Sequence, residues 1–91
     1  MITEFSQTLR VPVAYIVGPS REKLISTARQ LYWKVLRDNK GYTLQEIAEM
    51  TNRKSHATVF SGLKRINNLI DVKDKLAIEM WRKVKHLHGP Q

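Results

Sequence analysis

The stretch RKSHATVFSGLKRI, residues 53–66, indicates the fold class of this chain. It opens with two cations and a small polar cluster, and apolar residues then follow at helical spacing. The apolar positions are Val59, Leu63, Ile66 and, just beyond the stretch, Ile70. Ser55 stands where a helix N-cap belongs. The stretch therefore predicts a helix of about four turns whose first turn is polar and basic.

A second, shorter helix is predicted immediately upstream, in YTLQEIAEM, residues 42–50. Thr43 and Glu46 have the spacing of a capping box, and Tyr42 and Ile47 fit the hydrophobic staple around it. The polar run TNRK follows Met50 and ends the helix. A short helix, a short turn and a longer helix in this order are typical of a helix-turn-helix.

Two further helices are predicted on either side of this pair. The upstream one is expected over residues 21–39, with Ser20 as N-cap, Glu22 in the first turn and Gly41 beyond the end. Its apolar stripe has a period of about 3.6 residues and consists of Leu24, Ile25, Ala28, Leu31, Tyr32, Val35 and Leu36. The downstream helix is expected to start at Asp71 or Asp74 and to end at Gly89-Pro90. Its buried stripe would be Leu76 or Ala77, Met80, Trp81, Val84 and Leu87.

Residues 1–19 differ in composition from the rest of the chain. The run LRVPVAYIVGPS is apolar and β-branched, shows no helical period, and closes with Gly18-Pro19. A short strand, an arm packed on the helices and a segment for self-association all fit it. The sequence therefore predicts an all-α helix-turn-helix bundle of about four helices with a short non-helical N-terminal segment. The expected parts are 1–19, an arm or short strand, and 20–89, a helix-turn-helix DNA-binding domain.

Charge indicates the class of partner. The chain has 16 Lys plus Arg against 8 Asp plus Glu, a formal net charge of +8, and the whole excess falls after residue 19. No acid lies between Met50 and Ile70, which hold Arg53, Lys54, Lys64 and Arg65. A basic surface of this kind favours nucleic acid, although solvated basic faces without that role are common.

Other classes of function find little support in the sequence. The chain lacks cysteine, which excludes disulfides and thiolate metal sites and fits a reducing cytoplasm. No apolar run suits a membrane span, and no Gly-rich loop with Gly-Lys-Ser/Thr indicates a nucleotide site. His86 and His88 have no acid nearby. We expect a cytoplasmic, nucleoid-associated protein that is not an enzyme and needs no cofactor or metal.

The first turn of the longer helix suits contacts with duplex DNA. In a helix-turn-helix the second helix enters the major groove and its N-terminal residues touch base edges. His56 could donate to a base, and the methyl groups of Ala57 and Thr58 could meet a thymine methyl. Phosphates or guanine edges are expected for Arg53 and Lys54. Backbone contacts are expected one turn later, from Ser61, Lys64, Arg65 and Asn68.

Several separated motifs also match one family. The matching residues are Ala28-Arg29-Gln30, the run TLQEI at 43–47, the run KSHATV at 54–59, Arg65-Ile66 and Leu69. With these residues, the segment from Ser20 to about Leu87 resembles the C-terminal DNA-binding domain of the bacterial chromosomal replication initiator DnaA. The resemblance implies the all-helical, Trp-repressor-like helix-turn-helix fold and double-stranded DNA as partner.

The resemblance also implies residue roles. Arg29 would match an arginine that enters the minor groove. The expected base contacts are Lys54, Ser55, His56, Ala57, Thr58 and Arg29. The expected phosphate contacts are Arg21, Lys23, Thr43, Arg53, Ser61, Lys64 and Arg65. The family's signature has an aspartate where this chain has Ser55 and a threonine where it has Ala57. We therefore expect the family's binding geometry without recognition of its usual DNA box.

Two rival interpretations remain at the level of sequence. Ser55 and Ala57 weaken the expected base contacts, which leaves room for a non-specific DNA- or RNA-binding domain. Alternatively, the helical scaffold serves as a protein-interaction module, with the apolar segment 11–17 as its contact surface.

Overall fold

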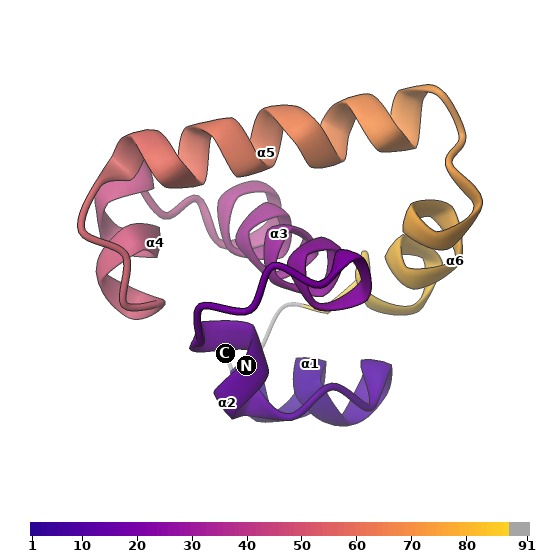
Figure 1. Cartoon of the computed structure of the whole chain (residues 1–91), viewed down its shortest axis with the longest axis horizontal. Helices are drawn as coiled ribbons and strands as arrows, with labels where there is room; N and C mark the ends of the chain where they lie inside the picture. Colours follow the sequence, from indigo (N-terminus) through magenta and orange to yellow (C-terminus); the bar gives the residue numbers. More distant parts are fainter. Residues whose placement is uncertain (88–91) are drawn as a thin grey trace.

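Six helices follow one another along the chain in the computed structural model, which describes residues 1–87 (Figure 1). No strand occurs in this part of the chain, so the all-α prediction is confirmed. The predicted helix end at Gly89-Pro90, the domain end at residue 89, and His88 lie outside the described residues. The helices are α1 (Ile2–Leu9), α2 (Val13–Val17), α3 (Lys23–Lys40), α4 (Leu44–Met50), α5 (His56–Asp71) and α6 (Lys75–Val84).

Helix α3 is the centre of the bundle and contacts each of the other five helices. Six of the seven residues predicted for its apolar stripe are buried, whereas Leu24 is 48% exposed at the first turn. Gly41 ends the helix in the left-handed conformation (φ 71°), as predicted. The helix begins at Lys23 rather than at residue 21. Glu22 is its N-cap, and the Ser20 hydroxyl accepts a hydrogen bond from the Glu22 amide instead.

Helices α4 and α5 form the predicted helix-turn-helix. The Thr43 hydroxyl accepts from the Glu46 amide (3.1 Å), and the Glu46 carboxylate accepts from the Thr43 amide (2.9 Å), which completes the capping box. Ser55 caps α5 by accepting from the Ala57 amide (3.1 Å). In Figure 1, α5 lies along one side of the molecule, with α4 at one end and α6 at the other.

The N-terminal segment corrects the sequence prediction, because residues 1–19 contain two helices and the bundle has six helices instead of about four. Phe5 and Ile16 are fully buried and Val11 nearly so, in the same core as α3, α4, α5 and α6. In α2, burial of Ile16 overrides the low helix propensity of a β-branched run. Helices α1 and α2 lie on the opposite side of α3 from α5 (Figure 1). Val13 and Tyr15 stay exposed.

The α5–α6 connection corrects a second detail. Asp71 is the last residue of α5, and Asp74 alone caps α6, by accepting from the Ala77 amide (3.1 Å). Ala77, Met80, Val84 and Leu87 are buried as expected. Among residues 1–87 no helix combines the length and the apolar character that crossing a membrane requires.

Candidate nucleic-acid interface

Helix α5 presents a polar ridge to solvent on the side away from the core. Its buried side consists of Val59, Gly62, Leu63 and Ile66. The exposed residues along the opposite side are Ala57, Ser61, Lys64 and Asn68, with His56 exposed at the helix start. This arrangement follows directly from the 3.6-residue period, because residues three and four apart share a face. Ala57 and Ser61 are small, but the exposed ring of Phe60 (56% exposed) lies beside them, so a partner that approaches the ridge would also meet an aromatic side chain.

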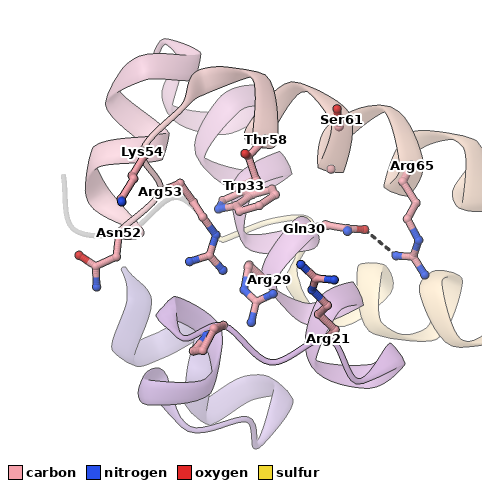
Figure 2. A pocket seen from close by; sticks show the side chains of 12 residues that line it. Arg21, Arg29, Gln30, Trp33, Asn52, Arg53, Lys54, Thr58, Ser61 and Arg65 are labelled. Atoms are coloured by element: carbon pink, nitrogen blue, oxygen red, sulfur yellow. Dashed lines mark hydrogen bonds between the residues drawn. The ribbon is translucent and has the colours of Figure 1, made fainter.

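A cationic groove of about 830 Å³ runs beside this ridge, between α3, the turn before α5 and the first half of α5. Figure 2 shows its charged side chains around one opening. Five cations line it, and none of the described lining residues is acidic. Seven of the residues predicted to contact DNA lie in its wall: Arg21, Arg29, Arg53, Lys54, Thr58, Ser61 and Arg65. The fold thus gathers charges that come from three separate stretches of the sequence.

The wall of the groove depends on a close approach between α3 and α5. A Cβ atom at Gly62 would lie 2.3 Å from a ring carbon of Trp33, so only glycine allows this packing. The Trp33 side chain is fixed in turn, since its indole Nε1 donates to the Thr51 hydroxyl (3.0 Å). The sequence does not reveal the contact between Trp33 and Gly62, because it joins helices that are distant along the chain.

Arg29 is not at the surface. It is 6% exposed, and its guanidinium donates to the carbonyl oxygens of Ile16 (2.8 Å), Ser20 (2.9 Å) and Tyr15 (3.0 Å). Burial lowers the pKa of Arg29, and the neighbouring charge of Arg53 lowers it further. In this structure Arg29 therefore binds the chain's own backbone, and the minor-groove contact that the family resemblance implies stays a prediction.

Arg53 has a similar environment in the turn before α5. Its guanidinium donates to the carbonyl oxygens of Gly18 (2.8 Å), Thr51 (3.1 Å) and Val17 (3.3 Å), and it lies 5.8 Å from the centroid of the Trp33 ring. Partial burial lowers the pKa of Arg53. The side chain lines the cationic groove, but its donors are directed at the chain rather than at an external phosphate.

The remaining predicted residues lie outside the groove wall. Three of them, Ser55, His56 and Ala57, are exposed around the start of α5, although the Ser55 hydroxyl is already used in capping. The others are spread over the molecule. Lys23 pairs with Asp74 (3.9 Å), Thr43 belongs to the capping box, and Lys64 lines a second hollow of about 700 Å³ on the other flank of α5.

Gln30 is a groove residue that the sequence did not assign to DNA contact. Its side-chain oxygen accepts from the Arg65 guanidinium (2.6 Å), shown as a dashed line in Figure 2. The pair joins α3 to α5 and fixes where the Arg65 charge stands. The run Ala28-Arg29-Gln30 is one of the motifs that match the family, so the sequence indicates this segment. It does not indicate that Gln30 binds Arg65.

Comparisons with known proteins agree with this architecture. The family model described as "Bacterial dnaA protein helix-turn-helix" matches residues 2–66. The chain is 30% identical over 74 residues to the chromosomal replication initiator protein DnaA of Thermomicrobium roseum, with 81% of the chain and 16% of that relative covered. It is 30% identical over 81 residues to the DnaA of a Picosynechococcus species, with 86% of the chain and 18% of the relative covered. No solved structure matches the chain significantly.

Proposed function

Because the chain belongs to the bacterial DnaA helix-turn-helix family of DNA-binding domains, we propose that it binds double-stranded DNA with a preference for sequence, through α5 in the major groove. The chain spans less than a fifth of the length of the curated relatives it matches. Those relatives are named as chromosomal replication initiators, and we propose that this chain acts in replication or its regulation, at the nucleoid.

The single observation that supports this function best is the placement of the cationic groove against the N-terminal half of α5. A duplex whose major groove receives the ridge of α5 brings its phosphate backbone beside the helix flank. On that flank stand Arg21 and Arg65. Phosphate contacts supply most of the affinity of such complexes, and base-edge contacts supply the preference for sequence.

We assign the roles from exposure and position. His56, Ala57 and Thr58 are exposed at the start of α5, with Lys54 just before it, and these four residues would meet base edges. Arg21, Ser61 and Arg65 would contact phosphates along the groove, and Lys64 would contact the strand on the opposite flank of α5. Ser55 contributes mainly as the cap of α5.

Selection of bound duplexes from a random pool, at near-physiological salt, tests the function. We expect an enriched motif. Against that motif and a scrambled duplex, His56→Ala should reduce the discrimination by about 1–3 kcal/mol. Lys64→Ala is the control for a phosphate contact. It should weaken binding to both duplexes alike and lower the slope of log affinity against log salt by about one unit.

The same experiment separates the rival functions. Binding without an enriched motif would support a non-specific basic domain, and a parallel titration with single strands and structured RNA would identify its substrate. Absence of binding to any nucleic acid would contradict the proposal and favour a protein-interaction module. Retention of full discrimination by His56→Ala would show that the start of α5 does not enter the groove.

A further inference from the structure

Two arginines, one on α3 and one in the turn of the helix-turn-helix, hold the carboxyl end of α2 and the residues just after it. Arg29, on α3, donates to the carbonyl oxygens of Tyr15, Ile16 and Ser20. Arg53, in the turn before α5, donates to those of Val17 and Gly18. The last carbonyls of a helix have no partner within the helix, and cations at that end are favoured by its dipole. The two side chains together donate to four successive carbonyls, those of residues 15–18, and to that of Ser20 beyond Pro19. We call this pair of side chains the arginine clamp.

We propose that the arginine clamp makes the N-terminal helix pair α1–α2 a positioning element of the DNA-reading surface. The inference rests on the proposed function. Arg53 directly precedes Lys54, Ser55 and His56, so the atoms that hold Arg53 also set where α5 begins. Its side chain is tied to α2, and its backbone amide donates to the Ala48 carbonyl of α4 (2.8 Å).

The chemistry of the clamp favours positioning over simple support. The planar guanidinium presents several donors in fixed directions, so one Arg53 side chain reaches Val17, Gly18 and Thr51 at once. Two partly buried cations near each other, with no acid among the described residues that line the groove, are unfavourable for the stability of the free chain. A neutral contact would join α2 to the bundle without that cost.

The clamp can be loosened from either partner in the full chain. Arg53→Lys keeps the charge but offers one compact ammonium in place of the fork. Gly18→Ala changes no charge. Its Cβ would lie 2.6 Å from the Ala14 carbonyl oxygen, so the carboxyl end of α2 must shift. Matched controls are Arg82→Lys, an exposed arginine on α6 outside both the clamp and the groove, and Val13→Thr, an exposed substitution on α2, the helix that Gly18 ends.

Two readouts are compared among these proteins: the preference for the selected motif over a scrambled duplex, and the backbone amide chemical shifts of residues 54–58 without DNA. We expect both clamp variants to lower the preference about tenfold, within the range of one base contact, with the salt slope unchanged. We also expect both variants to move the amide signals. The two controls should keep wild-type values in both readouts.

Several results would overturn the inference. One such result is that Arg53→Lys keeps the wild-type preference for the selected motif while Gly18→Ala leaves the amide chemical shifts of residues 54–58 unchanged. Another is a lower thermal midpoint with a wild-type preference in the folded fraction, because this would reduce the clamp to structural support. A fall of the salt slope in Arg53→Ala but not in Arg53→Lys, with the preference intact in both, would make Arg53 a phosphate contact. A wild-type chain without any duplex preference would instead contradict the proposed function.

Discussion

At the scale of single residues, the groove beside α5 depends on a glycine that faces a tryptophan. Trp33 is 3% exposed and is fixed by its hydrogen bond to Thr51, so the indole cannot easily move aside. A Cβ at Gly62 would meet two of its ring carbons at 2.3 and 2.7 Å. Glycine is therefore required here by contact with a neighbour, since its backbone lies in the ordinary helical region of α5.

Gly62→Ala should destabilise the protein although alanine is the better helix former. Overpacking a core contact costs about 1–3 kcal/mol, which exceeds the gain of roughly 1 kcal/mol in helix propensity. Urea denaturation would measure the change in the free energy of unfolding. Ser61→Ala, at an exposed neighbouring position, is the control and should stay within about 0.5 kcal/mol of wild type. A more stable Gly62→Ala protein would show that the indole moves.

At the scale of elements, α4 is a short helix whose start is fixed by its capping box. Isolated helices of such length do not persist in water. The reciprocal hydrogen bonds of Thr43 and Glu46 satisfy two amides that would otherwise lack partners. Burial of Ile47 and Ala48 then holds the helix on the bundle. The position of the turn, and hence of α5, follows from this defined start.

The box predicts a pH dependence. The hydrogen bond from the Thr43 amide, followed by that from its side chain, lowers the pKa of Glu46 below its ordinary value. A lowered pKa in the folded state means that the contribution to stability is present above the unfolded-state pKa and is lost as pH falls through the folded-state pKa. An NMR titration of the Glu46 carboxyl group should show this lowered midpoint.

Glu46→Gln tests the same element by stability, because the amide can still accept a hydrogen bond but does not titrate. The step in unfolding free energy that Glu46 contributes on acidification should vanish in this variant. A Glu46 carboxyl that titrates at or above its ordinary value would contradict the box as the cause.

At the scale of the whole molecule, residues 1–19 belong to the bundle rather than lying beside it. Phe5 is fully buried, and its ring centroid lies 5.1 Å from that of Tyr32 on α3. Helix α1 also contacts α6, so the two ends of the described chain share one core. We expect the helix-turn-helix and the N-terminal helices to unfold together.

Phe5→Ala should accordingly destabilise the entire chain by about 3–5 kcal/mol, the range for removing a buried aromatic ring. Circular dichroism and tryptophan fluorescence should report coincident transitions in urea, before and after the substitution. Thr3→Ala, an exposed position on the same helix, is the control. A loss below about 1 kcal/mol in Phe5→Ala would mean that α1 is a dispensable appendage.

The helix-turn-helix could be predicted from sequence because its signals are local. The caps at Thr43 and Ser55 and the apolar stripe of α5 each lie within one or two turns of the residues they organise. The N-terminal helices differ in this respect. Helix α1 has a local signal, because Ile2, Phe5 and Leu9 stand at helical spacing. Helix α2 has none, because Val13, Ile16 and Val17 favour extended chain by propensity, and the burial of Ile16 depends on distant helices.

The candidate site, too, has features that local sequence signals predict and features that depend on contacts distant along the chain. An excess of cations and the polar start of α5 are visible in the sequence, and the structure places both on adjoining surfaces. The sequence does not show which groups the side chain of each arginine contacts. Arg53 meets Gly18 across 35 residues and Arg29 meets Tyr15 across 14, so no local pattern reveals that their donors are already engaged.

The absence of acids from the described wall of the cationic groove has an energetic consequence for the free protein. Like charges held close together repel, so the cations of the groove lower the folding stability of the unbound domain while they form a surface suited to an anionic ligand. A bound polyanion neutralises these charges and removes the repulsion. Part of the free energy of binding therefore comes from the stability that the unbound domain lacks. Binding affinity and folding stability are then opposed in this domain. Substitutions that neutralise cations of the groove would raise the free energy of unfolding and lower the affinity for the ligand.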